Sequence, residues 1–228
     1  MNKYISIIPI RAGSKGLVDK NILTINQKPL YMYTVEQAIK STEKCFISTD
    51  IASIFDQDFP SQVQVVRRKK ELAGDTITLD LVLTDIFNDV NLEEYIVILL
   101  QVTSPLRSIQ DITNAIKMYE KNKYSMVMSV TEKESKILKY GLVENNIYYP
   151  IHNSGSVFMN RQDLPKVYSP NGAIYIFSVK DYLISNYYPL SRIGAYFMPK
   201  SRSIDVDTQK DFDFISKIML ENINRYIS

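Results

Sequence analysis

The 228-residue chain is poor in the residues on which much enzyme chemistry depends, with one cysteine, one histidine and no tryptophan. A single cysteine forms no internal disulfide, which favours a reducing compartment. One histidine and one cysteine do not make up the ligand set of a typical structural zinc site. Nucleophilic catalysis assisted by histidine would depend on His152 alone. Any chemistry must therefore rely on lysine, arginine, carboxylates, amides and a hard metal ion.

The sequence also lacks a large charge excess, a long apolar run and a targeting segment. Lysine and arginine number 27 against 25 acidic residues, so the net charge of +2 is unlike that of a strongly basic nucleic-acid-binding domain. The apolar stretch Tyr4–Ile10 is too short for a signal sequence, and no run reaches the ~18 apolar residues of a spanning helix. We therefore expect a cytoplasmic globular protein with no nucleic-acid or membrane partner.

Short β-branched runs alternate with helical patterns along most of the chain. The runs predict strands at Tyr4–Ile10, Cys45–Thr49, Gln62–Val66, Tyr95–Leu100, Ser125–Val130, Ala173–Phe177 and Ala195–Met198. Helical spacing predicts helices at Leu30–Lys40, Thr76–Phe87 with Asp75 as N-cap, Ser108 or Asp111 to Tyr119, Lys180–Ile184 and Gln209–Asn224. This alternation predicts a single α/β domain over residues 1–228, built on a doubly wound, mostly parallel, Rossmann-like sheet.

The alternation breaks between residues 133 and 166. Gly141, Pro150, Gly155 and Pro165 lie in this stretch among clustered polar residues. We interpret it either as a loop or as a small antiparallel excursion that packs on a partner subunit.

A basic, glycine-containing loop follows the first predicted strand. Gly13 and Gly16 permit a tight turn whose N–H groups face an anion, and Arg11, Lys15 and Lys20 add positive charge. Such a loop lies at the carboxyl ends of the strands, where open parallel sheets bind ligands. The loop matches neither the Walker A nor the dinucleotide-binding pattern. It predicts a polyphosphate site, with a solvated basic turn as the alternative.

Two aspartates, Asp205 and Asp207, lie two residues apart near the C-terminus. In an extended segment their side chains share one face. Paired carboxylates beside phosphates suit Mg²⁺, with Mn²⁺ as a second candidate ion. The alternative is that Asp207 or Thr208 only caps the last helix.

Two further motifs carry polar groups. Gln101 follows the most apolar predicted strand and directs a neutral amide at the same crevice, while Arg107 either binds a phosphate or carboxylate or simply precedes a helix. The four consecutive basic residues Arg67–Lys70 are by themselves typical of a solvated face.

Taken in order, these motifs resemble those of the bacterial CMP-sialic acid synthetases, or acylneuraminate cytidylyltransferases. The matching stretches are IPIRAGSKGLVDKN at 8–21, with Ile10 in place of the usual alanine, STD at 48–50, ELAGDT at 71–76, LLQVTSPLR at 99–107, PNGAIYI at 170–176 and SIDVDT at 203–208. The resemblance spans nearly the whole chain. The related 3-deoxy-manno-octulosonate cytidylyltransferases are less similar, because they typically carry a different loop at residues 13–16.

The resemblance implies a fold of the nucleotidyltransferase type and a set of nucleotide contacts. Residues implied to bind CTP are Arg11, Ala12, Gly13, Ser14, Lys15, Lys20, Asn21 (at the ribose), Arg68 (at the cytosine) and Ile77 (through its backbone). Asp205 and Asp207 match the metal-binding pair.

The resemblance also implies an acidic nine-carbon sugar as second substrate. Residues implied to contact it are Gln101, Tyr175, Tyr187, Tyr188, Lys139 and Arg161. The last two belong to the 133–166 excursion, which in the family builds a homodimer with shared active sites. Arginine is a natural bidentate partner for the carboxylate of such a sugar.

The implied reaction is transfer of CMP from CTP to the anomeric hydroxyl of the sugar, with release of pyrophosphate. Arg11 and Lys15 would stabilise the leaving group, Gln101 would orient the sugar, and Asp207 is the first candidate for the general base. The alternatives are a 3-deoxy-manno-octulosonate-type cytidylyltransferase and a non-catalytic nucleotide-binding module. The sequence leaves open whether the sugar is N-acetylneuraminate, a legionaminate or a pseudaminate.

Overall fold

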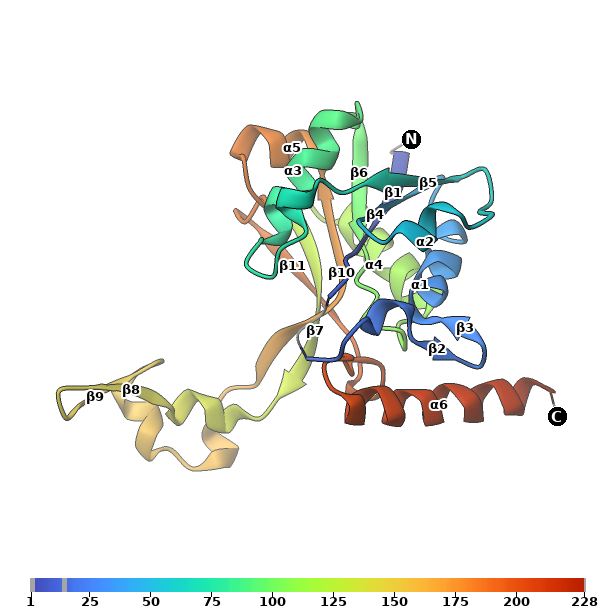
Figure 1. Ribbon diagram of the computed structural model, residues 1–228. Helices are drawn as coiled ribbons and strands as arrows, with labels where there is room; N and C mark the ends of the chain where they lie inside the picture. Colours follow the sequence, from blue (N-terminus) through green and yellow to red (C-terminus); the bar gives the residue numbers. More distant parts are fainter. Residues whose placement is uncertain (1–2, 14–15, 228) are drawn as a thin grey trace.

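A seven-stranded sheet forms the centre of the protein (Figure 1). The computed structural model describes residues 3–13 and 16–227, with side chains up to residue 221. In spatial order the sheet contains β11 (Ile193–Phe197), β7 (Met126–Lys133), β10 (Val167–Ser178), β6 (Tyr95–Leu99), β1 (Lys3–Ile10), β4 (Lys44–Thr49) and β5 (Val63–Arg67). Each strand coincides with a predicted one, and the α/β, Rossmann-like fold is confirmed.

Helices cover both faces of the sheet. The helices are α1 (Leu30–Ile39), α2 (Ala52–Phe55), α3 (Leu79–Asp89), α4 (Ile109–Lys121), α5 (Val179–Ser185) and α6 (Gln209–Ile227). Alternate residues of β1 face opposite ways: Ile5 and Ile7 pack with α3 and α5, whereas Ile8 and Ile10 pack with α1, α4 and α6. Full burial of each isoleucine contributes roughly 1.5–3 kcal/mol, so the continuous apolar run of β1 is explained by its two covered faces.

Strand β10 departs from the parallel arrangement. It pairs antiparallel with both β6 and β7, while the other neighbouring strands of the sheet run parallel. The reason lies in the connection: between β7 and β10 the chain leaves the sheet and returns without a crossover helix, which a parallel pair would require.

The segment between β7 and β10, residues 134–166, is called the arm below. It contains the antiparallel hairpin β8 (Gly141–Glu144) and β9 (Ile147–Pro150), and the 3-10 turns η3 (Ser135–Lys139), η4 (Ser154–Phe158) and η5 (Arg161–Asp163). The hairpin turn is made by Asn145 and Asn146, which have φ values of 50° and 64°. The arm extends away from the sheet (Figure 1).

Helix α3 begins later than predicted. Its N-cap is Thr78, and Asp75 instead contacts Arg11 across the crevice. Residues 74–77 form a turn, closed by the hydrogen bond from Ile77 N to Gly74 O (3.2 Å), so the ELAGDT motif lines a pocket before the helix starts.

The remaining elements are short. They are the hairpin β2 (Thr24–Ile25) and β3 (Lys28–Pro29) and the 3-10 turns η1 (Lys20–Ile22), η2 (Lys70–Leu72) and η6 (Lys200–Arg202). Across the described residues, we find no helix that combines the length and the apolar character needed to cross a membrane.

Candidate active site

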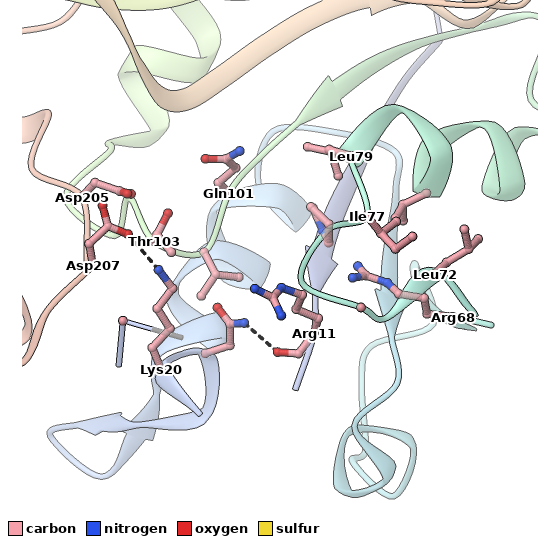
Figure 2. Close-up of a pocket in the computed structure, with 16 residues that line it drawn as sticks. Arg11, Lys20, Arg68, Leu72, Ile77, Leu79, Gln101, Thr103, Asp205 and Asp207 are labelled. Atoms are coloured by element: carbon pink, nitrogen blue, oxygen red, sulfur yellow. Dashed lines mark hydrogen bonds and ion pairs between the residues drawn. The ribbon is translucent and has the colours of Figure 1, made fainter. Parts of the chain in front are cut away.

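A pocket of about 450 Å³ lies at the carboxyl ends of β1, β5 and β6 (Figure 2). It brings together most of the residues that the sequence predicted for nucleotide and metal binding. Of these, the residues lining it are Arg11, Lys20, Asn21, Arg68, Ile77, Asp205 and Asp207, and Gln101, which was predicted to orient the sugar, lines it as well. Three apolar side chains that the sequence did not assign to the site complete one wall: Leu72 belongs to the ELAGDT motif itself, and Leu79 and Val82 belong to α3, which follows it.

Two arginines form the basic side of this pocket. Arg11 follows β1, and its Nη1 donates to Gly13 O (3.2 Å) and contacts the Asp75 carboxylate. Arg68 follows β5 and is buried, with Nη2 donating to Ser48 O (3.0 Å). Burial lowers the pKa of Arg68 to about 10, which leaves its guanidinium charged at neutral pH. Both cations face the cavity, where a polyanion would meet them.

The acidic segment, residues 203–207, lies on the opposite side of the pocket (Figure 2). Lys20 Nζ donates to Asp207 Oδ1 (3.0 Å) and to Val206 O (2.8 Å). Asp205 Oδ1 is buried and has no hydrogen-bond partner among the described residues. Burial raises the pKa of Asp205 to about 6, and the neighbouring Asp207 also acts to raise it.

Thr208 caps α6, since Asp211 N donates to Thr208 Oγ1 (3.3 Å) and Thr208 N donates to Asp211 Oδ2 (2.9 Å), whereas Asp205 and Asp207 fit a divalent cation. A buried carboxylate oxygen without a donor is satisfied by a cation, and carboxylate oxygens are ligands that Mg²⁺ prefers. No cluster of three or more histidine, cysteine or acidic side chains suited to a metal occurs in the part of the chain that is described. The two aspartates would therefore share the ion with substrate oxygens and water, as Mg²⁺ sites commonly do.

The loop after β1 is folded tightly against the acidic segment. A Cβ on Gly16 would collide with Asp207 O, so only glycine permits this approach. The Ala12 N–H donates to Asp50 Oδ1 (2.9 Å), and the Gly13 N–H donates to Asp19 Oδ1 (3.4 Å). Asn21 Nδ2 holds the loop by donating to Arg11 O (3.0 Å). The predicted residues Ser14 and Lys15 lie outside the described residues.

A second, more apolar pocket of about 320 Å³ adjoins the first, since Leu79 and Gln101 line both. It contains the three predicted tyrosines, Tyr175, Tyr187 and Tyr188. The sequence did not reveal its remaining walls, which are Leu99, Met126, Met128 and Leu190. Met126 and Met128 occupy alternate positions of β7, so their side chains lie on the same face of the strand. This spacing is visible in the sequence, but it does not indicate that the face lines a pocket.

Gln101 stands between the two pockets against the backbone of Gly172. A Cβ on Gly172 would approach Gln101 Oε1 to 2.5 Å, and Gly172 also has a φ of 76°. The positive φ favours glycine at this position, and any larger residue would also displace the end of the Gln101 side chain.

Besides Ala12 and Gly13, three further candidate residues line neither pocket. Arg107 is fully buried and donates from Nη1 to Ala173 O (2.6 Å), which leaves only a structural role. Lys139 and Arg161 lie on the arm, where Arg161 Nη2 is 3.7 Å from Glu134 Oε1. His152 is also on the arm and is exposed.

The two adjoining pockets have different linings, which suit two different kinds of ligand. Cations on one wall and a carboxylate pair on the other suit a polyphosphate with its metal ion. The adjoining apolar pocket, with the Gln101 amide at the junction, suits a second molecule that carries both apolar and hydrogen-bonding groups.

Comparisons with known proteins point in the same direction. A family model described as cytidylyltransferase matches residues 5–227. The N-acylneuraminate cytidylyltransferase of Streptococcus agalactiae serotype V is 37% identical over 92% of the chain and 52% of its own length. The CMP-N,N'-diacetyllegionaminic acid synthase of Legionella pneumophila is 29% identical over 95% of the chain and 96% of its own length.

Solved structures share the fold. The structure of CMP:2-keto-3-deoxy-manno-octonic acid synthetase complexed with CTP aligns with a TM-score of 0.71, covering 97% of this chain and 100% of that one at 17% identity. The chain spans about half the length of the Streptococcus agalactiae relatives it matches.

Proposed function

Because the chain belongs to the cytidylyltransferase family, we propose that it transfers CMP from CTP to the anomeric hydroxyl of a nonulosonic acid and releases pyrophosphate. The observation that carries this proposal is the pair of adjoining pockets. Arg11 and Arg68 face Asp205 and Asp207 across the first pocket, Lys20 pairs with Asp207, and Gln101 lines both this pocket and the second one. Relatives named for N-acylneuraminate, pseudaminic acid and legionaminic acid support the sugar class.

Catalysis in this proposal relies on positioning and charge. The sugar hydroxyl attacks the α-phosphorus of CTP in line, and the bond from that phosphorus to pyrophosphate breaks. Arg11 holds the phosphates and offsets charge that builds on the leaving pyrophosphate, while the Gln101 amide orients the sugar. Gln101 accepts no proton, so the attacking hydroxyl must transfer its proton to a carboxylate or to water; Asp207, exposed at the edge of the pocket, is the candidate.

We also propose that Asp205 and Asp207 bind a divalent cation. When bound, Mg²⁺ supplies Lewis-acid polarisation of phosphate oxygens and lowers the pKa of a bound hydroxyl. Lys20 supports this site from the protein side, because its ammonium group pairs with Asp207 and fixes the backbone at Val206.

We further propose a homodimer in which the arm completes the partner's sugar pocket. The arm exposes several large apolar side chains, including Phe158 at 90%, Val143 at 68% and Leu142 at 63% exposure. A surface of this kind is typical of a protein interface. Lys139 and Arg161 do not line the pockets of their own chain, so a partner's site is where they would meet a sugar carboxylate.

The proposal is tested by measuring pyrophosphate release from each of the four ribonucleoside triphosphates with a panel of sugar acids. We expect release with CTP, Mg²⁺ and at least one nonulosonic acid, and background release without the sugar. Pyrophosphate release only with 3-deoxy-manno-octulosonate would show that the substrate is this sugar acid and not a nonulosonic acid. No pyrophosphate release with any sugar acid would favour a non-catalytic nucleotide-binding module.

Gly172→Ala is expected to raise the KM for the sugar acid about tenfold or more while the KM for CTP changes little. The added methyl group would displace the Gln101 amide, so that the sugar acid loses a hydrogen-bonding contact that CTP does not use. Steady-state kinetics with each substrate varied in turn would check this. Gly155→Ala, on the arm where a methyl group meets nothing closer than 3.4 Å, is the matched control. Equal effects on both KM values would argue against a sugar role for Gln101.

A further inference from the structure

The acidic segment has no regular secondary structure, so its position depends on tertiary contacts. Near the pocket, Val206 N donates to Thr103 O (2.8 Å). Where the segment starts, Asn171 Nδ2 donates to Ser203 Oγ (2.8 Å). Two charged contacts hold the segment: Lys20 pairs with Asp207 at its end, and Arg202, the residue immediately before it, pairs with Asp111.

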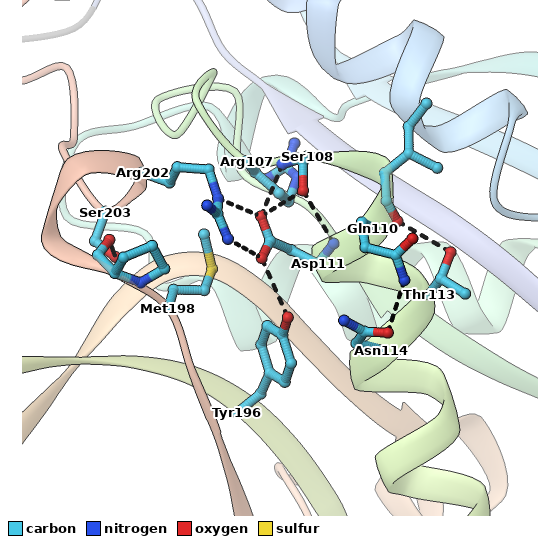
Figure 3. Close-up of polar contacts among 12 residues, drawn as sticks. Arg107, Ser108, Gln110, Asp111, Thr113, Asn114, Tyr196, Met198, Arg202 and Ser203 are labelled. Atoms are coloured by element: carbon cyan, nitrogen blue, oxygen red, sulfur yellow. Dashed lines mark hydrogen bonds and ion pairs between the residues drawn. The ribbon is translucent and has the colours of Figure 1, made fainter.

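Arg202 is bound to the buried carboxylate of Asp111 (Figure 3). Its Nε lies 2.9 Å from Asp111 Oδ2 and its Nη2 lies 2.8 Å from Asp111 Oδ1, the bidentate geometry that fixes orientation as well as distance. The Asp111 side chain is 2% exposed and that of Arg202 is 42% exposed. Tyr196 at the end of β11 also donates to Asp111 Oδ1 (3.1 Å).

The same carboxylate anchors the other side of the site. Ser108 N donates to Asp111 Oδ2 (2.9 Å) and Asp111 N donates to Ser108 Oγ (3.1 Å), which forms the capping box that starts α4; Ser108 Oγ also donates to Asp111 Oδ2 (2.7 Å). Ser108 ends the loop that carries Gln101 and Thr103. Asp111 therefore joins, at one buried point, the loop from β6 and the start of the acidic segment.

These contacts connect the acidic segment to the loop after β6 at two separate points. The two chain segments are joined once at Asp111, away from the pocket, and again at the hydrogen bond between Val206 and Thr103, beside it. If the first junction opens, the start of the acidic segment keeps only neutral hydrogen bonds such as that from Asn171 to Ser203, and a shift there would move the buried oxygen of Asp205.

We propose that the Asp111–Arg202 ion pair is a positioning element that fixes the acidic segment against the Gln101–Thr103 loop and thereby sets the affinity of Asp205 and Asp207 for a divalent cation. The pair touches neither substrate nor ion in this account, and acts through the backbone of residues 203–207. The inference rests on the proposed function for the role of that ion in catalysis, but ion binding is measured without turnover.

The test is the dissociation constant of Mn²⁺, followed by electron paramagnetic resonance on the full chain in the presence of CTP and without sugar. Arg202→Met keeps much of the apolar stem and removes the charge; Arg202→Lys keeps the charge and loses the bidentate geometry. The matched control is Arg192→Met, since Arg192 is exposed and packs on the Tyr124 ring.

We expect Arg202→Met to weaken Mn²⁺ binding about tenfold or more, Arg202→Lys to lie between it and the wild type, and Arg192→Met to have no effect. In turnover assays the apparent KM for Mg²⁺ should rise for Arg202→Met, with kcat largely recovered at saturating Mg²⁺. A lower melting temperature with an unchanged Mn²⁺ constant would overturn the proposal and leave a purely structural pair.

If Arg202→Met does not fold, Arg202→Lys decides the question, and an unchanged constant overturns the proposal. Wild-type protein that binds no Mn²⁺ would also overturn it. Weakened Mn²⁺ binding in a protein that forms no CMP-sugar would instead sustain the positioning role and count against the proposed function.

Discussion

Asp207→Ala is expected to lower kcat by about 100- to 1,000-fold, the range seen when one electrostatic contact to a transition state is removed. Asp207 is one of two carboxylates on the acidic wall, and its partner in the structure is the ammonium group of Lys20. Without it, Asp205 alone would hold the ion, and Lys20 would lose the charge that orients it.

The same substitution is expected to leave the fold intact. The Asp207 side chain is 68% exposed, so its removal empties no packed space. Circular dichroism and thermal melting would establish this before kinetics are measured at saturating CTP, sugar acid and Mg²⁺. Asp213→Ala, an exposed aspartate of α6, is the matched control and should behave as the wild type. Near-normal turnover of Asp207→Ala would remove this residue from the metal site and from the list of candidate bases.

Mixing Arg161→Ala with Arg11→Ala is expected to restore activity that neither variant has alone. Arg11 lines the pocket of its own chain, whereas Arg161 lies on the arm. Each variant alone should lose about 100-fold or more in kcat/KM, because a charged contact to substrate is missing from every site. In a mixed dimer one of the two sites has both arginines.

The size of the recovery follows from counting sites. Random pairing of equal amounts makes half of the dimers mixed, and half of the sites in those are complete, so about a quarter of the wild-type activity should return. Lys166→Ala, at another exposed cation of the arm, should be active without mixing. If mixing restores nothing although mixed dimers form, Arg161 does not act in a partner's site; if the protein is monomeric, the dimer itself is wrong.

The order of strands and helices was predictable because burial leaves a periodic trace in the sequence. The continuous apolar runs of β1 and β6 identify strands covered on both faces. The direction of β10 was not predictable in this way, since a β-branched run has the same composition in a parallel or an antiparallel strand. The arm decides it, by bringing the chain back along β7.

The pocket was predicted better at its charged groups than at its walls. Arg11 stands in a short motif at the end of β1, where a parallel sheet concentrates ligand contacts, and Asp205 and Asp207 stand in a short motif of paired carboxylates before α6. Arg107 stands in an equally suggestive motif, yet it is buried against backbone carbonyls. The difference depends on neighbours distant in sequence, such as Ala173, 66 residues away.

The contacts that hold the acidic segment could not be predicted from the sequence either, because they also join residues that are far apart in the chain. Asp111 and Arg202 are 91 residues apart, and Asp111 by itself indicates only the start of a helix. The roles of Lys139 and Arg161, the homodimer and the cytoplasmic location stay predictions.

The most direct test of the account follows the phosphorus atoms of CTP. The protein is incubated with Mg²⁺, a nonulosonic acid and CTP radiolabelled at either the α- or the γ-phosphorus, and the products are separated. The account predicts that the α-label appears in a CMP-sugar, that the γ-label appears in pyrophosphate, and that both depend on the sugar. A γ-label on the sugar, or an α-label released as free CMP without sugar, would contradict cytidylyl transfer.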